Sequence, residues 1–170
     1  MTEISLPCGR VLLIDDADAH LLEGRNWHSE KRGRTHYARG RLRGENKCGI
    51  YLHTFLTGGR TDHRNGDGLD NTRGNLRRCT QAQNGLNRRP KQGKKFKGVF
   101  FDKRRGHFYA QVVLNRKAHS SPRFDNQEDA ARWHDAKARE LHGEFAHLNF
   151  PAVMLDRKDA RQTEMFAEVA

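Results

Sequence analysis

Residues 61–78 restrict the fold of this 170-residue chain more than any other segment. The segment is rich in Asn, Asp and Gly, which favour turns because they tolerate left-handed backbone conformations or bond to their own backbone. It starts at the end of a predicted strand and ends at a short stretch, Asn75-Leu76, that begins the next one. Beyond it, Thr80 and Gln83 fit a capping box, and Pro90 stops the resulting helix after about two to three turns. The pattern predicts strand, loop, strand and helix in that order, with Asn84 in the first turn of the helix.

The first sixty residues predict several short elements. An apolar run at residues 11–14 precedes an Asp cluster at residues 15–18, which caps a short helix. A hairpin begins near Trp27 and returns at residues 35–39, and residues 50–56 form a short apolar helix or strand. We expect this half to be a scaffold for the segment that follows it.

Residues 85–117 carry a dense positive charge. Eleven Lys and Arg residues lie there against one acid, Asp102, and the whole chain has a formal net charge of +11 and a pI of about 10.1. This balance is typical of proteins that bind polyanions, and nucleic acid is the leading partner. A charge run alone fits a solvated linker equally well.

The same half predicts three short antiparallel strands and a helix. The first two strands are expected at residues 99–101 and 108–114, and the third where the chain becomes apolar again at Phe124. The helix is expected at residues 127–141. One face of that helix carries a stripe at helical spacing, namely Ala131, His134, Ala138 and Leu141. The helix can therefore cover one face of a three-stranded antiparallel sheet.

Composition excludes several classes of protein. Hydrophobic residues make up 35% of the chain and the mean hydropathy is −0.97, but nine Phe, three Tyr and two Trp can build small cores. No apolar run reaches the ~20 residues of a membrane span, so we expect a cytoplasmic protein with no membrane partner. Cys8, Cys48 and Cys79 form no C-x-x-C pair, and we expect reduced cysteines and no zinc.

Asp62-His63, Asn75 and Asn84 carry the predicted chemistry. Hydrolysis of a phosphodiester needs a hard cation, which neutralises charge at the phosphorus centre, and a base, which deprotonates the attacking water. The Asp62 carboxylate and the Asn84 amide oxygen suit Mg²⁺, with Mn²⁺ as a substitute, and the His63 imidazole suits the base. Neighbouring strand residues point to opposite faces, so Asp62 and His63 share one site only if the strand breaks there.

These residues resemble the HNH endonucleases of phage and mobile introns, including homing-type enzymes of phage and bacteria. The resemblance rests on Asp62-His63-x-Asn65-Gly66, Leu69-Asp70-Asn71, Asn75-Leu76-Arg77 and Gln83-Asn84. It implies an HNH ββα metal finger at residues 58–90, in which Asp62 and Asn84 bind the metal. His63 is then the general base, and Asn75 orients the loop or the histidine.

The other polar residues of this region have plainer interpretations. Asn65, Asp67, Asp70 and Asn71 are expected to form turns rather than to bind metal, because Asn and Asp are common in loops for that reason. His53 matches a common upstream feature of the same family, and we interpret it as a packed scaffold histidine.

The second half resembles the ethylene-response-factor (APETALA-type) DNA-binding domain. The resemblance rests on Lys97-Gly98-Val99, Tyr109-Ala110-Gln111-Val112, Phe124-Asp125, Glu128-Asp129-Ala130-Ala131, Leu141-His142-Gly143 and Ala146-x-Leu148-Asn149-Phe150-Pro151. It implies a sheet that lies in the major groove and reads it through Arg and Trp side chains. This sequence has Phe100 and Phe108 where Arg and Trp are usual.

We expect the basic segment to contact DNA. Arg104 and Arg105 lie at a predicted hairpin tip and can reach a groove, and the linker lies along the phosphate backbone. The candidate DNA-binding residues are Arg88, Arg89, Lys94, Lys95, Lys97, Lys103, Arg104, Arg105 and Gln111.

The sequence therefore predicts an α+β chain with two modules. A nuclease domain spans residues 1–90, a basic linker residues 91–96, a DNA-binding domain residues 97–151 and a polar tail residues 152–170. The expected function is metal-dependent nicking of double-stranded DNA by a monomer without a protein partner. Two other functions stay open: a non-cleaving DNA-binding regulator and, on charge alone, an RNA-binding protein, which the lack of aromatic stacking motifs disfavours.

Overall fold

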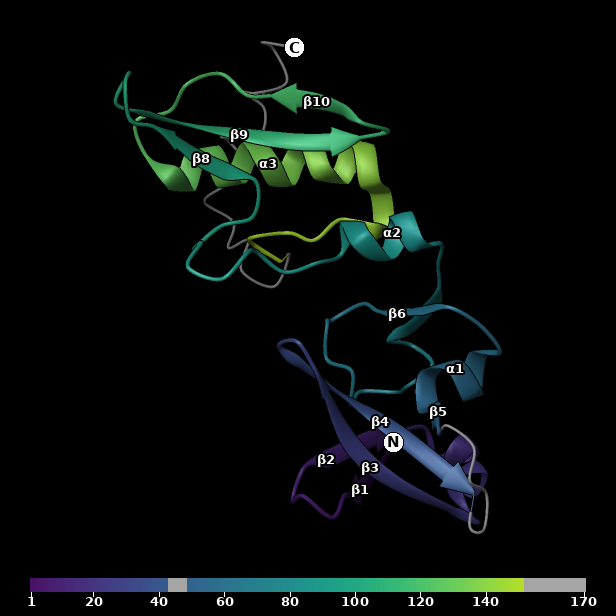
Figure 1. Cartoon of the computed structure of the whole chain (residues 1–170). Coiled ribbons are helices and arrows are strands. Elements are labelled where there is room, and N and C mark those ends of the chain that lie inside the picture. The colour runs from purple at the N-terminus through teal and green to yellow at the C-terminus, as the bar shows by residue number, and fades with distance from the viewer. Residues whose placement is uncertain (43–48, 152–170) are drawn as a thin grey trace. The chain divides into compact units, whose positions relative to one another are not determined.

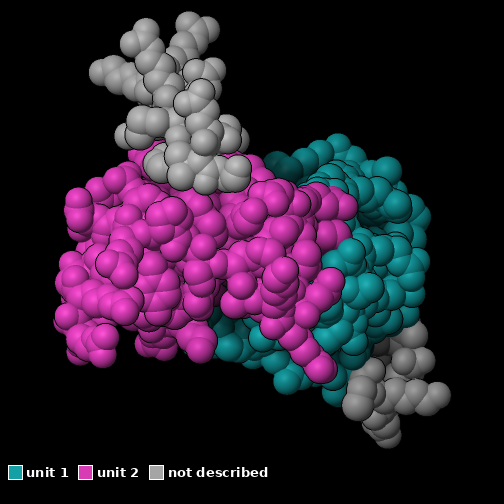
Figure 2. Space-filling model, turned by 90° about the horizontal axis from the view of Figure 1, so that it is seen from above, with its two compact units in different colours: residues 1–88 teal, residues 89–170 magenta. Residues whose placement is uncertain are grey.

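The computed structural model describes residues 1–42 and 49–151 of the chain. It is a mixed structure of several small antiparallel sheets and a few helices, which confirms the predicted α+β class. Two compact units divide the chain, Met1–Arg88 and Arg89–Ala170 (Figure 2). Cys48 and the predicted polar tail lie outside the described residues.

The first unit begins with a two-stranded sheet of which the sequence predicted one strand. Strand β1 (Thr2–Ser5) pairs antiparallel with β2 (Val11–Ile14), the predicted apolar run. The short helix that follows is a 3-10 helix, η1 (Asp16–Leu22). Asp15 lies at its N-cap but makes no side-chain capping bond, because its carboxylate accepts from the Arg73 amide at 2.7 Å instead, so the predicted cap is wrong.

The next elements form a three-stranded antiparallel sheet. Strands β3 (Arg25–Arg32) and β4 (Thr35–Leu42) make the predicted hairpin, and β5 (Ile50–Tyr51) pairs with β4 (Figure 1). Helix α1 (Leu52–Thr57) starts directly after β5, so the apolar segment at residues 50–56 is part strand and part helix.

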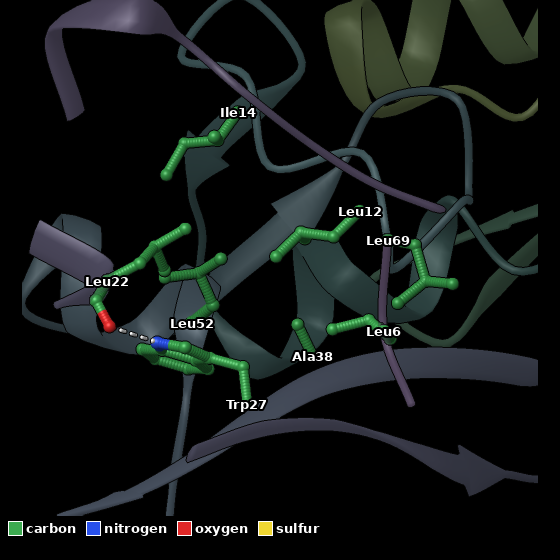
Figure 3. Close-up of a cluster of buried hydrophobic side chains, with 8 residues drawn as sticks. All are labelled: Leu6, Leu12, Ile14, Leu22, Trp27, Ala38, Leu52 and Leu69. Carbon is green, nitrogen blue, oxygen red and sulfur yellow. Dashed lines mark hydrogen bonds between the residues drawn. The ribbon is translucent and has the colours of Figure 1, made fainter. Parts of the chain in front are cut away.

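Eight buried apolar side chains form the core of the first unit (Figure 3). The indole Nε1 of Trp27 donates to the Leu22 carbonyl at 3.1 Å, which satisfies the polar atom of the largest side chain in the cluster. A Cβ at Gly40 would lie 2.6 Å from the Trp27 ring, so glycine lets β4 approach the indole. The cluster comprises Leu6, Leu12, Ile14, Leu22, Trp27, Ala38, Leu52 and Leu69.

The strand, loop, strand and helix predicted after residue 60 are present. Strand β6 (Thr61–His63) pairs antiparallel with β7 (Leu76–Arg78), and helix α2 (Gln81–Leu86) follows. The capping box is confirmed, since Thr80 and Gln83 each accept a hydrogen bond from the other's backbone N–H, at 3.1 and 2.8 Å.

Helix α2 is shorter than the two to three turns that the sequence suggested. Its six residues end at Leu86, with Asn87 as the C-cap, before the chain reaches Pro90. The Asn87 side chain donates to the His63 carbonyl at 2.9 Å and to Asp62. Helix α2 therefore ends where Asn87 contacts β6. The position of Pro90 in the sequence does not indicate these contacts.

The loop between β6 and β7 is fastened to the N-terminal segment. Leu13 in β2 donates to the Leu69 carbonyl at 2.9 Å and accepts from the Asn71 amide at 2.8 Å. The Arg73 guanidinium forms two hydrogen bonds of 2.6 Å with the Asp18 carboxylate. These contacts agree with the scaffold role expected of the N-terminal half.

The second unit contains a three-stranded antiparallel sheet and one long helix. The sheet has the order β10-β9-β8, with β8 at Val99–Asp102, β9 at His107–Leu114 and β10 at Lys117–Ser120. Helix α3 (Gln127–His142) packs against β9 and β8 on one face of the sheet (Figure 1). A short 3-10 helix, η2 (Gly143–Phe145), ends this part of the chain.

The third strand does not lie at Phe124, where the sequence predicted it. Asn115 and Arg116 both adopt positive φ, 49° and 66°, so the chain reverses in a two-residue turn and pairs at once as β10. Phe124 forms an isolated bridge to Phe108 instead. The apolar character of Phe124 reflects its packing against the core of the unit rather than a strand.

A polar network inside the second unit holds the segment after α3. Asn149 Oδ1 accepts from the Lys97 amide at 2.7 Å, and the Asn149 amide group donates to the buried Asp135 carboxylate at 3.0 Å. Gly98 has a φ of +71°, and a Cβ there would clash with the His134 ring.

In the part of the chain that the structure describes, no helix is long and apolar enough to cross a membrane.

Candidate active site

Asp62 is held between the partner strand and the end of α2. It is 6% exposed and lies opposite Arg77 in the β6–β7 register. Arg77 donates from Nη2 at 2.5 Å and from Nε at 2.9 Å, both to Oδ2. Asn87 Nδ2 lies 3.2 Å from Oδ1 and 3.0 Å from Oδ2. The carboxylate is thus part of a buried ion pair with an amide donor beside it.

His63 has a different set of neighbours. Its ring meets Tyr37 and His53 edge to face, with centroids 5.7 and 5.0 Å away. Its Nε2 is buried and has no hydrogen-bond partner among the described residues. Burial lowers the pKa of His63, and the Asn71 side chain and nearby carboxylates only partly oppose this effect. Near neutral pH the imidazole is therefore uncharged and able to accept a proton.

The side chains of Asp62 and His63 keep the alternation of a strand. β6 ends at His63, and the chain turns there, because Gly66 donates to the His63 carbonyl at 2.9 Å. Even so, Asp62 contacts Arg77, whereas His63 contacts Tyr37 on β4. β6 ends only after His63, so Asp62 and His63 are both paired within the strand, and the two side chains do not share their contacts.

His53 packs beside His63 as part of an aromatic cluster. Its ring stacks on Tyr51 at 5.5 Å with an angle of 11°, and it meets Tyr37 edge to face. Burial, with a smaller contribution from the charge of His63, lowers the pKa of His53 to about 4. These contacts are those of a packed scaffold histidine, although its Nδ1 has no partner in the described chain.

Asn75 joins the two ends of the loop. Its Oδ1 accepts from the Asn65 amide at 3.0 Å, and its Nδ2 donates to the Asp70 carbonyl at 2.7 Å. Its own carbonyl accepts from the Arg64 amide at 2.9 Å, directly after His63. Asn75 thereby fixes the backbone that leaves β6.

The expected turn residues fall into two groups. The side chains of Asn65, Asp67 and Asp70 each accept from a backbone amide two residues further on, at 2.8, 3.0 and 3.2 Å. These contacts confirm their interpretation as turn formers. Asn71 differs, because it is fully buried and its Oδ1 has no hydrogen-bond partner among the described residues.

Asn84 lies in the first turn of α2, where its amide donates to the Thr80 carbonyl at 3.0 Å. Asn87, three residues further on, is the residue of this helix end that contacts Asp62. Residues three apart on a helix are neighbours on one face, about 5–6 Å between Cβ atoms. The hydrogen bonds from this end of the helix to Asp62 come from Asn87, the C-cap, and not from Asn84.

Asp62 and Asn84 have the donor types that fit a hard divalent cation. A carboxylate has about four lone-pair sites, which leaves room for a cation beside the bonds to Arg77 and Asn87. Within residues 1–42 and 49–151, no group of three or more His, Cys, Asp or Glu residues is placed to hold a metal. A site here therefore depends on the amide oxygen of Asn84 and on water or phosphate.

Sequence reasoning missed three contacts of this site. The sequence motif contains Arg77 but assigns it no role, and Asn87 and Tyr37 lie outside the motif. One signal in the sequence could have identified Asn87 as a residue of the site, because it follows Asn84 by three residues on a predicted helix. The approach of Tyr37 depends on Gly68, where a Cβ would clash with the Tyr37 ring.

The candidate DNA-binding residues, all but Arg88 in the second unit, have several environments. Arg104 and Arg105 lie exposed in the β8–β9 turn, where their amides donate to the Asp102 side chain. Lys95 pairs with Glu128 at 2.7 Å, and Lys94 lies over the Phe100 ring at 5.3 Å. The remaining basic candidates are also solvent-accessible: Arg88, Arg89, Lys97 and Lys103.

The two phenylalanines at unusual positions lie on opposite faces of the sheet. Phe108 packs against the core beneath α3. Phe100 is 37% exposed on the other face, where it stacks on Tyr109 at 5.4 Å. Gln111 lies two residues further along β9 and donates to Ser120 Oγ at 3.1 Å. The open face thus carries the aromatic pair Phe100 and Tyr109 beside Gln111.

Comparisons with known proteins give one distant similarity. A curated relative from Acanthamoeba polyphaga mimivirus, named as an uncharacterized HNH endonuclease, is 30% identical over an alignment of 105 residues, which covers 58% of this chain and 54% of the relative. The chain spans about half the length of that relative. No family model and no solved structure matches the chain. The similarity supports a relationship to the HNH endonucleases.

Proposed function

We propose that this chain is a metal-dependent endonuclease that nicks double-stranded DNA at a site formed by Asp62, His63 and Asn84. The observation that carries the proposal is the uncharged, buried His63 with an unpartnered Nε2 among the described residues, directly after Asp62 on the β6–β7 hairpin. The distant relative named as an HNH endonuclease supports the reaction class.

His63 is the general base of the proposed reaction. Its lowered pKa leaves the imidazole unprotonated near neutral pH, so it can take a proton from a water molecule. The water oxygen then bonds to phosphorus as the bond to the 3′ oxygen breaks, and a proton from solvent completes the leaving hydroxyl. The products are a 5′-phosphate and a 3′-hydroxyl end.

Asp62 and Asn84 would hold Mg²⁺, which supplies positive charge against the charge that develops on the phosphate and the leaving oxygen. Asn75 acts at a distance from the reacting atoms. Its bonds to the loop fix the backbone after His63 and so hold the base in place. One such site in a monomer cuts one strand.

The second unit anchors DNA in this proposal. Its exposed cations at the β8–β9 turn neutralise phosphates, a contribution to affinity that does not depend on sequence. The sheet is backed by α3 on one face and leaves Phe100 exposed on the other, and in this proposal the Phe100 face meets a groove of the DNA.

The test is incubation of the full-length protein with supercoiled plasmid in Mg²⁺, with EDTA as the control. We expect conversion to the open-circular form in Mg²⁺ and none in EDTA. Retarded migration of the plasmid without nicking would contradict the proposal and favour a non-cleaving DNA-binding regulator. Cleavage of RNA but not of DNA would overturn the assigned substrate.

A further inference from the structure

The ion pair between Asp62 and Arg77 is unusual for a carboxylate that is proposed to bind a cation. Both side chains are almost fully buried, with 7% of the Asp62 side chain and 6% of the Arg77 side chain exposed. Two guanidinium bonds go to Oδ2, at 2.5 and 2.9 Å. The carboxylate therefore already has a cationic partner within the fold.

An ion pair of the same unit with an exposed arginine and a buried aspartate provides a contrast. Arg73 also forms two short bonds with an aspartate, Asp18, but 65% of its side chain is exposed. Water screens such a guanidinium, whereas a buried charge acts through a medium of lower effective dielectric. Arg77 thus exerts a stronger field at Asp62 than a surface arginine would.

A buried ion pair is weak support for stability, because the cost of removing two charges from water offsets much of their attraction. The fold alone therefore gives little reason for an arginine at position 77. A divalent cation bound to Asp62 would lie close to the Arg77 guanidinium, and the two positive charges would repel each other. Both would also depend on the single negative charge of the Asp62 carboxylate.

We propose that Arg77 competes with the divalent cation for the Asp62 carboxylate and so lowers the metal affinity of the site. This inference rests on the proposed function, because it takes Asp62 as a metal ligand. Arg77 is then a residue that sets metal affinity, and its ion pair weakens when the cation binds.

The first test is titration of the full-length protein with Mn²⁺ in the absence of DNA, with free Mn²⁺ measured by electron paramagnetic resonance. Arg77→Gln removes the charge and keeps a hydrogen-bond donor, whereas Arg77→Lys keeps the charge. Because the guanidinium and the cation repel each other in a medium of low effective dielectric, we expect Arg77→Gln to bind Mn²⁺ at least about tenfold more tightly. Arg77→Lys keeps the repelling charge and should remain within about threefold of the wild type.

Arg78→Gln is the matched control. It removes the same charge one position along β7, from an exposed residue that lies opposite Thr61 rather than Asp62. We expect its Mn²⁺ affinity to equal that of the wild type. Equal affinities for the wild type and Arg77→Gln, or equal gains in Arg77→Gln and Arg78→Gln, would overturn a specific role for Arg77.

Asp62→Asn separates this inference from the proposed function. Loss of Mn²⁺ binding in Asp62→Asn, together with an unchanged Arg77→Gln, would leave the metal site intact and reject the competition. Unchanged binding in Asp62→Asn would reject the metal site itself, and the competition with it.

A second measurement needs no variant that removes the charge. In wild-type protein with ¹⁵N-labelled arginine and asparagine, the Arg77 Nε–H signal is identified by its absence in Arg77→Lys. We expect its exchange with solvent to accelerate as Mg²⁺ is added, because the ion pair weakens. Unchanged exchange at a Mg²⁺ concentration that saturates the shift of the Asn84 side-chain amide would contradict the proposal.

Discussion

The rings of His53 and His63 meet edge to face, with their centroids 5.0 Å apart and an angle of 84° between their planes. Each has a buried nitrogen without a hydrogen-bond partner in the described chain, Nδ1 in His53 and Nε2 in His63. Two protonated imidazoles at this distance would repel each other, and burial disfavours the charged form of both. The pair is therefore uncharged near neutral pH, and its two members can be tested separately.

His63→Ala should lower the rate of DNA cleavage by about 10²–10⁴, because the variant lacks the base. DNA affinity should remain within a few-fold, since the imidazole is assigned no role in holding the backbone. Single-turnover cleavage and gel-shift assays measure the two quantities. His53→Gln is the control: full activity in His63→Ala and none in His53→Gln would move the base to His53.

The stability of the first unit should fall in mild acid because of His53. Its pKa is lowered to about 4 in the folded chain, so the unfolded chain, with an ordinary value near 6.5, takes up a proton first as the pH falls. The contribution of the uncharged His53 to the free energy of unfolding is fully present above about pH 6.5 and is lost toward pH 4. Between pH 7 and pH 5 we expect a loss of about 2 kcal/mol in the free energy of unfolding.

Urea denaturation at the two pH values measures this loss. Trp133→Phe provides the background, because it leaves Trp27 in the core of the first unit as the fluorescent probe. In that background, adding His53→Gln should make the loss smaller by about 2 kcal/mol. Identical losses in the two proteins would show that His53 carries no such linkage.

Asn75→Ala should destabilise the first unit by about 1–3 kcal/mol, because it leaves a loop amide and a loop carbonyl without their partners. Cleavage should be reduced but not abolished. Asn75→Asp keeps the acceptor for Asn65 and loses the donor to Asp70, so it should be intermediate in stability. A fully stable Asn75→Ala protein would contradict the role of this residue in the loop.

Local patterns in the sequence were sufficient to predict the elements around the site. The capping box of α2 needs only residues three apart, and the turn at Asn65 needs only its neighbours. The class of the fold and the helix that covers the second sheet also follow from local periodicity. These features form from interactions over a few residues, which a single sequence displays directly.

The contacts of Asp62 could not be predicted in that way. The pairing with Arg77 depends on the register of β6 and β7 across the intervening loop, and the loop is set by its attachment to Leu13 in β2. The third strand of the second unit was misplaced because the observed strand, β10 (Lys117–Ser120), is mostly polar and exposed and so shows no apolar pattern in the sequence. The contacts of Asp62 thus depend on tertiary geometry, whereas β10 lacks a local hydrophobic signal.

The β8–β9 turn should contribute to the salt dependence of DNA binding. Simultaneous substitution of Lys103, Arg104 and Arg105 by Gln should reduce the slope of log K against log salt concentration by about 2.7, because each neutralised phosphate accounts for about 0.9. Fluorescence anisotropy with a labelled duplex at several salt concentrations measures the slope. Lys137→Gln on α3, a residue paired with Glu140, is the control and should leave the slope unchanged.

The central claim is that cleavage depends on a cation held by Asp62 and Asn84. The most direct measurement is the rate of plasmid nicking as a function of Mg²⁺ concentration for the wild type, Asp62→Ala and Asn84→Ala. We predict saturable activation of the wild type, in which Mn²⁺ can replace Mg²⁺, and loss of cleavage in both variants at every concentration. Wild-type nicking in EDTA, or an unchanged Mg²⁺ dependence in Asn84→Ala, would contradict the account.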